Sequence, residues 1–169
     1  MTLTRTRLLC AGLMLGAAVQ GSLYAGQRGG EPAAAAPAPG SPGIYRSNDE
    51  LTAVLKKATE AAPAMSTSPV MNTDQYRINI VRRGTSAGAI AHAGNTELHY
   101  IVDGAATFVT GGTIVRPTTT GAVAEIQGGV SRHVAKGDVV VIPENSPHWY
   151  KDVDGSITYL EVRFVAPKK

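Results

Sequence analysis

The residues of this sequence best suited to metal chemistry are three histidines and one glutamate. Glu97 and His99 stand two positions apart, so in a β-strand their side chains share one face. His92 precedes Glu97 by five residues, and His148 lies in a second segment further along the chain. Imidazole nitrogens and carboxylate oxygens are common ligands of divalent first-row metals. The pattern therefore predicts a metal site if the fold brings the two segments together.

His92 is expected to reach Glu97 through a β-hairpin. Residues 88–92 are predicted to form a strand, and Gly94-Asn95 provides a turn into the strand that carries Glu97. A carboxylate on the inner face of a small barrel is costly to bury without a cation or a proton, which favours metal binding. Taken singly, His92 is also explained as a rim residue and His148 as a polar loop residue.

Two residues near these ligands are candidates for moving a proton, His99 and Tyr150. Tyr150 shares the face of His148 because side chains alternate along a strand. His99 is interpreted in two ways, as a fourth metal ligand or as a pocket residue that hydrogen-bonds a ligand. His133 matches no such pattern and is expected to be solvated.

The chain beyond Pro63 predicts an all-β domain. Its apolar residues recur with a period of two, in short runs rich in Val, Ile, Thr and Tyr that Gly, Pro, Asn and Asp interrupt. Short, evenly spaced strands favour a closed sandwich or barrel, because closure removes unpaired strand edges. The predicted strands are residues 76–83, 88–92, 97–102, 105–110, 122–126, 131–135, 139–142, 148–152 and 157–164.

One short amphipathic helix is predicted ahead of the strands, at about residues 48–61. Ser47 and Glu50 have the spacing of a capping box, and Leu51, Leu55 and Ala58 recur at helical intervals. The apolar stripe is expected to cover a face or an edge of the sheet that follows. Residues 47–73 are accordingly assigned to the helix and a connecting loop, and residues 74–167 to the barrel.

Two segments of the chain resemble the motifs of the cupin superfamily. The first motif places a glutamate seven residues before a glycine and a histidine five residues before that glutamate, as His92, Glu97 and Gly104 do. The second runs from glycine through proline to histidine, as Gly137, Pro143 and His148 do. The resemblance implies a single-domain cupin barrel, also described as a jelly roll or double-stranded β-helix, like the small bacterial cupins.

The resemblance also implies the ligand set of the metal. Ile90 stands where the family has the first histidine of its His-x-His pair, which leaves His92, Glu97 and His148, with His99 as a fourth candidate. Two histidines and one carboxylate suit Fe(II), and with less discrimination Mn, Co, Ni or Zn. Asn145 stands where the family often has glycine, and Asp152 replaces a closing asparagine.

The N-terminal region is expected to direct export. Arg5 and Arg7 precede an uninterrupted apolar run at residues 8–19, and Ala25 ends a stretch that a signal peptidase could cleave. Residues 1–25 are therefore predicted to be a signal peptide, with an uncleaved anchor as the alternative. Residues 26–46, rich in Ala, Pro and Gly, are predicted to be a disordered linker. The mature protein is expected in the periplasm or the medium, without a stable membrane anchor.

The net charge, the cysteine count and the motifs of the sequence restrict the classes of partner that this protein is expected to bind. The formal charge of +3 falls to +1 once Arg5 and Arg7 are removed, which argues against nucleic acid as a partner. The single cysteine lies in the predicted signal, so no disulfide framework is expected. The sequence also contains no Gly-rich phosphate loop or serine nucleophile elbow. A small molecule remains as the expected partner, with a homodimer left open.

Two functions fit these features. One is a metal-dependent enzyme that oxygenates, decarboxylates or isomerises a small polar molecule, a range that the family resemblance implies. The other is a non-enzymatic module that binds a metal or a small ligand in the periplasm, since one architecture hosts many roles. Ile90 in place of a histidine favours the second function slightly, and three protein ligands with open metal positions favour the first.

Overall fold

The computed structural model describes residues 34–165, in which one helix precedes eight strands. The predicted signal peptide and the first part of the predicted linker lie outside the described residues. Within residues 34–46, the backbone of Ala34 pairs with the turn that follows β1, and Ala36 donates a hydrogen bond to Asp74. The elements are α1 Asn48–Ala61, β1 Met65–Asn72, β2 Tyr76–Arg83, β3 Thr96–Thr110, β4 Thr113–Val115, β5 Glu125–Gln127, β6 Val130–Ala135, β7 Val139–Ile142 and β8 His148–Phe164.

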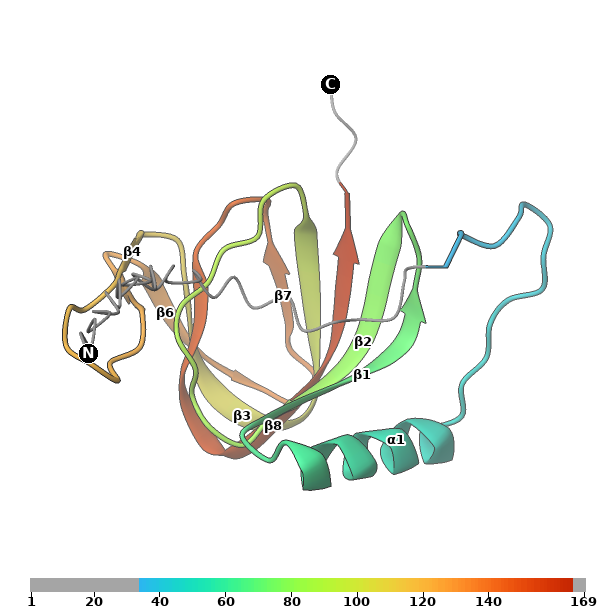
Figure 1. Cartoon of the computed structure of the whole chain (residues 1–169), viewed down its shortest axis with the longest axis horizontal. Coiled ribbons are helices and arrows are strands. Elements are labelled where there is room, and N and C mark those ends of the chain that lie inside the picture. The colour runs from blue at the N-terminus through green and yellow to red at the C-terminus, as the bar shows by residue number, and fades with distance from the viewer. Residues whose placement is uncertain (1–33, 166–169) are drawn as a thin grey trace, which may run out of the picture. The chain divides into compact units, whose positions relative to one another are not determined.

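The strands form an all-β barrel, as the sequence predicts. The larger sheet has the order β1-β2-β8-β3-β6, with β7 also paired to β3, and β4 and β5 form a separate two-stranded sheet. Every strand pair in both sheets is antiparallel. In Figure 1 the strands curve around a common interior, and α1 runs along the outside next to β1. The central members, β3 and β8, pair along almost their whole lengths.

Each of these two long strands was expected to be two strands joined by a turn. Asp103-Gly104 and Asp154-Gly155 are bulges within continuous strands, and the register shifts between Ile101 and Asp103 and again between Gly104 and Ala106. Gly104 has φ of 77° and Gly155 has φ of 72°, a conformation that serves a bulge as well as a turn. The bulges bend β3 and β8 without breaking their pairing.

The helix is confirmed with its predicted bounds and its capping box. The Ser47 side chain accepts from the Glu50 backbone, and the Glu50 carboxylate accepts from the Ser47 backbone. The segment that follows was predicted to be a connecting loop, but residues 65–72 form β1. Its polar residues conceal the strand, because Ser66 and Ser68 face the helix and hydrogen-bond to Thr59 and to the Val54 carbonyl.

A second correction concerns residues 88–92, which were predicted to be a strand in a hairpin with β3. Only Ile90 pairs, through an isolated bridge to His148. The Ala89 amide next to it donates to the Ala124 carbonyl, so the segment bonds to the loop before β5 as well as to the start of β8. Glu97 on β3 instead has Ile142 of β7 and Arg163 of β8 as its strand neighbours.

The core consists of two apolar clusters. The larger fills the barrel interior with aliphatic and aromatic side chains, and it contains Tyr150 and Tyr159. The smaller places Trp149 against Ala89, Val109 and the residues of the β4–β5 sheet, with the Trp149 indole N–H donating to the Ala87 carbonyl. Trp149 thus faces away from His148 and Tyr150, as its alternation along the strand predicts.

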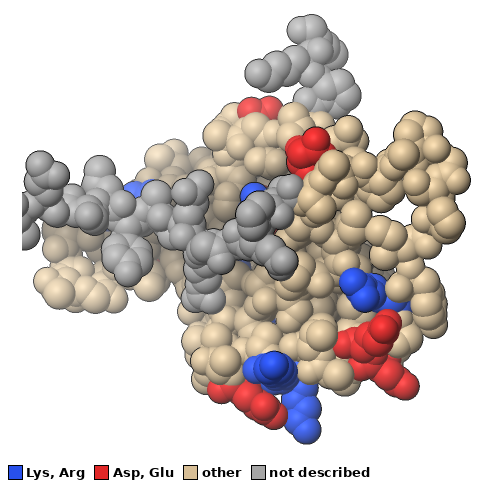
Figure 2. All heavy atoms as spheres, turned by 45° about the vertical axis from the view of Figure 1, so that its right-hand side comes forward, with Lys and Arg blue, Asp and Glu red and all other residues tan. Residues whose placement is uncertain are grey.

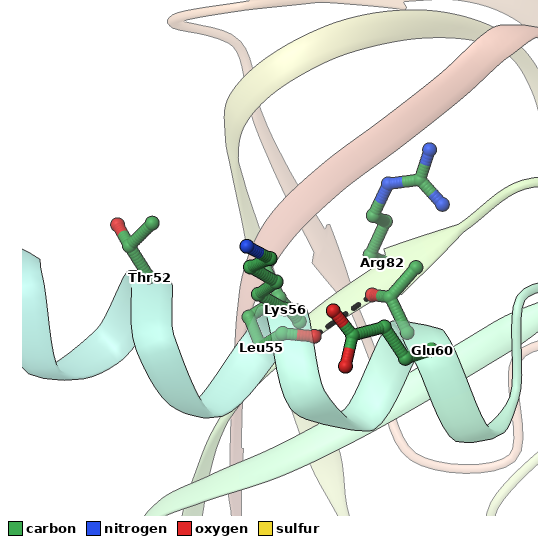
Figure 3. Close-up of a pocket in the computed structure, with 6 residues that line it drawn as sticks. Thr52, Leu55, Lys56, Glu60 and Arg82 are labelled. Atoms are coloured by element: carbon green, nitrogen blue, oxygen red, sulfur yellow. Dashed lines mark hydrogen bonds between the residues drawn. The ribbon is translucent and has the colours of Figure 1, made fainter.

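An open groove lies on the outer surface between α1 and β2. It has a volume of about 360 Å³, and Figure 3 shows Lys56 and Glu60 projecting from the helix and Arg82 from the strand. On the face shown in Figure 2, Lys and Arg residues and Asp and Glu residues are scattered among uncharged ones, with no field of one sign. Within residues 34–165, no helix has the length and apolar character needed to span a membrane.

Candidate metal centre

The two central strands supply most of the candidate site. Glu97 and His99 lie on the inner face of β3, where strand alternation places them. Antiparallel register sets Arg163 of β8 opposite Glu97 and Glu161 opposite His99. Directly opposed side chains on one face have Cβ atoms about 5 Å apart, so four polar residues are forced into one small volume.

The turn before β8 positions His148 and His92. Asn145 has φ of 62°, the left-handed conformation that asparagine tolerates better than most residues with a side chain, and it stands where the cupin motif often has glycine. The backbone N–H of Asn145 donates to the His92 carbonyl, and the backbone N–H of Gly94 donates to the Glu144 carboxylate. These bonds hold the loop that carries His92 against the start of β8, where His148 lies.

The three predicted principal ligands converge on one point. Nε2 of His92 lies 3.4 Å from Oε1 of Glu97, and Nε2 of His148 lies 3.9 Å from Oε2 of the same carboxylate. One ligand atom from each residue lies within 4.8 Å of the other two. Atoms at such separations can surround an ion that binds each at ~2.0–2.2 Å. A second group with the same property comprises Glu97, His99 and Glu161.

The donor atoms fit a divalent cation. Nδ1 of His148 is 3.1 Å from the Ser146 carbonyl, which can only accept, so Nδ1 carries the proton and Nε2 keeps its lone pair. Nε2 of His92 is buried and has no hydrogen-bond partner. A buried nitrogen without a partner is costly, and a metal ion would satisfy it. A backbone carbonyl that fixes the tautomer of a histidine is the usual support for a metal ligand.

The electrostatics also favour the ligating protonation states. Burial alone would raise the pKa of Glu97, but the hydrogen bond from His99 and the charge of Arg163 outweigh it and hold the pKa at about 2. Burial lowers the pKa of His148 to about 4, and burial together with Arg163 lowers the pKa of His92. At neutral pH the carboxylate is therefore ionised and both of these imidazoles are neutral, as metal ligands must be.

His99 links the carboxylate to Tyr150. Its Nε2 is 3.3 Å from Oε2 of Glu97, and its Nδ1 is 3.1 Å from the Tyr150 hydroxyl. Burial raises the pKa of Tyr150 above its ordinary value of 10.0, and burial raises that of Tyr159 to about 12, so both phenols keep their protons. With Tyr150 donating to Nδ1, the proton of His99 lies on Nε2 and is donated to Glu97. In this tautomer His99 orients the carboxylate and offers no lone pair to an ion.

The structure therefore brings together all the residues singled out for chemistry: His92, Glu97, His99, His148 and Tyr150. His133 lies apart, with a side chain that is 63% exposed and only a 3.9 Å contact to Asp154. Its expected solvation is what the structure shows.

Several buried polar residues of the cluster were assigned no role from the sequence. Glu161 is buried, and its carboxylate accepts hydrogen bonds from Asn79 and from Arg163. Arg83, which is also buried, donates to the Tyr159 hydroxyl and lies over the ring of Tyr150. Alternation along residues 157–164 could have grouped Glu161 and Arg163, but their neighbours depend on strand pairing, which the sequence does not state.

Comparison with known proteins finds similar solved structures. No model of a known protein family matches it, and no curated protein sequence does either. Hydroxypropylphosphonic acid epoxidase from S. wedmorenis aligns over 60% of this chain and 51% of its own, at 14% identity and a TM-score of 0.48. The cupin domain of Schizosaccharomyces pombe Cnp3 aligns over 60% and 65%, at 9% identity and a TM-score of 0.47.

A third solved structure is that of a predicted oxalate decarboxylase from Thermotoga maritima. It aligns over 60% of this chain and 81% of its own, at 16% identity and a TM-score of 0.47. The alignment thus spans about half of the epoxidase chain and about two thirds of the Cnp3 domain. All three TM-scores lie below 0.5. The predicted all-β barrel preceded by one helix is confirmed by the strands and the helix of the chain itself.

Proposed function

We propose that this chain is an exported metalloprotein that binds one divalent ion through His92, Glu97 and His148 and acts on a small polar molecule. The observation that carries the proposal is the convergence of two neutral imidazoles and one ionised carboxylate inside the barrel. The buried Nε2 of His92, which has no hydrogen-bond partner, supports it. The predicted signal peptide supports export to the periplasm or the medium.

The ligand set leaves room for chemistry. Three protein ligands leave coordination positions open, and a divalent ion held there would supply Lewis acidity or, if it is iron, reactivity with dioxygen. Two histidines and one carboxylate suit Fe(II) best, and Mn, Co, Ni and Zn less selectively. Oxygenation, decarboxylation and isomerisation all remain within reach of such a site.

The neighbouring residues have separable roles in this proposal. His99 donates from Nε2 to Glu97 and thereby fixes the orientation of the carboxylate. Tyr150 is a proton donor rather than a base, because burial raises its pKa. Until it is given up, the proton of the Tyr150 hydroxyl is held in the hydrogen bond to Nδ1 of His99, 3.1 Å away. The wall beside them is apolar, with Phe108 at 4.5 Å from Tyr150 between ring centroids, which limits water at this end of the site.

A binding module without turnover is the alternative, and the position of Ile90 favours it. The family's first histidine would stand there, but Ile90 cannot ligate a metal, and its side chain is 37% exposed. The ion would then have one protein ligand fewer than in a four-ligand cupin. Such a site could serve to capture a metal or a small ligand.

Metal analysis tests the proposal. Wild-type protein isolated after export is expected to contain about one divalent ion per chain by inductively coupled plasma mass spectrometry. His148→Ala should lose the ion and keep the far-UV circular dichroism of the barrel, while His133→Ala should retain the ion. A wild-type protein that takes up none of the five metals at micromolar concentration would refute the site. Turnover assays on the loaded protein then separate the enzyme from the binding module.

A further inference from the structure

Two side chains of the charged cluster reach solvent, and the others are buried. Glu97 and His99 have side chains that are 1% and 2% exposed, whereas those of His92 and Arg163 are 28% and 22% exposed. His92 and Arg163 therefore form the mouth of the site. A ligand that reaches the ion position on this side would meet an imidazole and a guanidinium.

Arg163 is incompletely used by the protein. Its Nη2 donates to Glu161 over 3.0 Å, while its Nε lies 3.5 Å from Oε2 of Glu97 without forming a hydrogen bond. Nε is buried and has no partner. A guanidinium carries five N–H donors in a planar fork suited to a carboxylate. One N–H group of the Arg163 guanidinium thus donates to Glu161, and other N–H groups of the same guanidinium remain for a ligand at the mouth.

A second arginine stands beside the first. The register of β2 and β8 sets Arg77 directly opposite Arg163, and Arg77 lies two positions from Asn79, whose side chain points inward to Glu161. Arg77 is exposed, and among residues 34–165 no carboxylate lies within salt-bridge distance of it. Like charges directly opposite one another destabilise a sheet. A pair of arginines at a mouth is therefore explained better by an anionic ligand than by stability.

The charges of the cluster lead to the same conclusion. Glu97 and Glu161 are two carboxylates and Arg163 is one guanidinium, while His92 and His148 add no charge because a histidine that coordinates a metal is neutral. A divalent ion would leave this cluster with a surplus of one positive charge, before Arg77 is counted. In a partly desolvated site such a surplus is best neutralised by a monoanion.

We propose that Arg163, with Arg77 beside it, recognises the carboxylate of a small monoanionic ligand at the mouth of the metal site. This inference rests on the proposed function and adds to it the substrate class, a small carboxylic acid. Arg163 holds the carboxylate through its free donors, and the rest of the ligand then lies over His92 and Glu97. Glu161, which accepts from both Asn79 and Arg163, acts as a positioning residue for the guanidinium.

Anion binding to cobalt(II)-loaded protein tests this inference, with visible absorption of the bound cobalt as the signal. Titration of wild type with acetate should perturb the spectrum at millimolar concentration, and the neutral isostere acetamide should not. Arg163→Gln should weaken acetate binding at least tenfold, and Arg77→Gln should weaken it a few-fold, with cobalt stoichiometry retained. Arg82→Gln is the matched control, because Arg82 lies in the groove beside α1, and it should leave acetate binding unchanged.

The outcomes separate the two proposals. A wild-type protein that binds no cobalt overturns the metal site, whereas cobalt binding with equal acetate affinity in wild type and Arg163→Gln overturns only the carboxylate assignment. Tighter binding of inorganic phosphate than of acetate would also overturn it. If Arg163→Gln fails to fold, Arg163→Lys and Arg77→Gln decide the matter: a lysine lacks the planar fork, so Arg163→Lys should bind acetate more weakly than wild type.

Discussion

The imidazole of His99 and the phenol of Tyr150 lie nearly parallel, with 10° between the ring planes and 3.1 Å between Nδ1 and the hydroxyl oxygen. The pair is buried, and the other nitrogen of His99 faces Glu97. The phenol therefore determines which nitrogen of His99 carries the proton. The hydrogen bond that Glu97 accepts, and with it the pKa of Glu97, therefore depends on Tyr150, which does not contact Glu97.

Tyr150→Phe is expected to retain metal but to destabilise the metal-free protein by about 1–2 kcal/mol, because a buried imidazole nitrogen loses its hydrogen-bond partner. With the tautomer no longer fixed, the pKa of Glu97 should rise. Urea denaturation measures the first effect, and carboxyl chemical shifts in a pH titration measure the second. Tyr100→Phe, on the exposed outer face of β3, is the control and should change neither. An unshifted Glu97 pKa in Tyr150→Phe would contradict the proposed tautomer.

Metal binding is expected to stabilise the fold through His92, Glu97 and His148. A ligand present at a hundred times its dissociation constant adds about 2.7 kcal/mol to the free energy of unfolding. Differential scanning calorimetry with and without the ion should show this gain in wild type. Glu97→Gln should abolish it, and His133→Ala should preserve it. The same gain in Glu97→Gln would place the ion elsewhere.

The metal-free protein is expected to lose stability as the pH falls from about 6.5 to about 2. The folded-state pKa of His148 is about 4, against an ordinary value of 6.5, and that of Glu97 is about 2, against 4.5. Within each interval the unfolded chain binds more protons than the folded one, so acid favours unfolding. Taken alone, each of the two groups should lower the free energy of unfolding by on the order of 3 kcal/mol across its interval, at about 1.4 kcal/mol per pKa unit.

Urea denaturation between pH 7 and pH 3 measures this loss. The carboxylate of Glu97 faces His92, His99, His148 and Arg163, with Glu161 on the adjoining strand, so the loss reflects the whole cluster. His148→Gln removes one titrating group and should flatten the upper part of the profile. A profile that is as steep in His148→Gln as in wild type would exclude His148 as its source.

Gly104, the glycine of the first motif, is expected to be required for the fold rather than for chemistry. A Cβ at this position would clash with the backbone oxygen of Ser156 on β8, whereas a Cβ at Gly155 would meet nothing within 4 Å. Both glycines have positive φ, so alanine at either costs about 1–2 kcal/mol in backbone strain. Gly104→Ala should lose more than Gly155→Ala in thermal denaturation. Equal losses would show that β8 shifts freely at the bulge.

Local chemistry made some elements predictable. The capping box of Ser47 and Glu50 gave the bounds of α1, alternation gave those of β2, and a short β-branched run after Gly137 gave those of β7. β1 was missed because its face toward α1 is polar and because the strand contains Pro69, a residue type that an edge strand tolerates. The long strands were divided at Gly104 and Gly155 because a glycine with positive φ suits a turn and a bulge equally.

The ligands were predictable, but the way in which they meet was not. The spacing of His92 from Glu97 suggested a hairpin, yet the residues before His92 pair with His148 through Ile90. Spacing identifies residues that can coordinate one ion, and tertiary pairing decides the route by which they meet. Arg163 stayed unassigned for the same reason, since its place opposite Glu97 follows only from the register of β8 with β3.

Two of the three proposed ligands are fixed in strands that run through the whole barrel, and only His92 belongs to a loop. Glu97 and His148 cannot leave their places unless β3 and β8 separate, whereas the segment before β3 can open while the sheet stays intact. Local opening costs less than global unfolding. Local opening of residues 84–95 would therefore set the rate at which an ion enters or leaves the site. That rate should be far higher than the rate of amide exchange at Glu97 and His99.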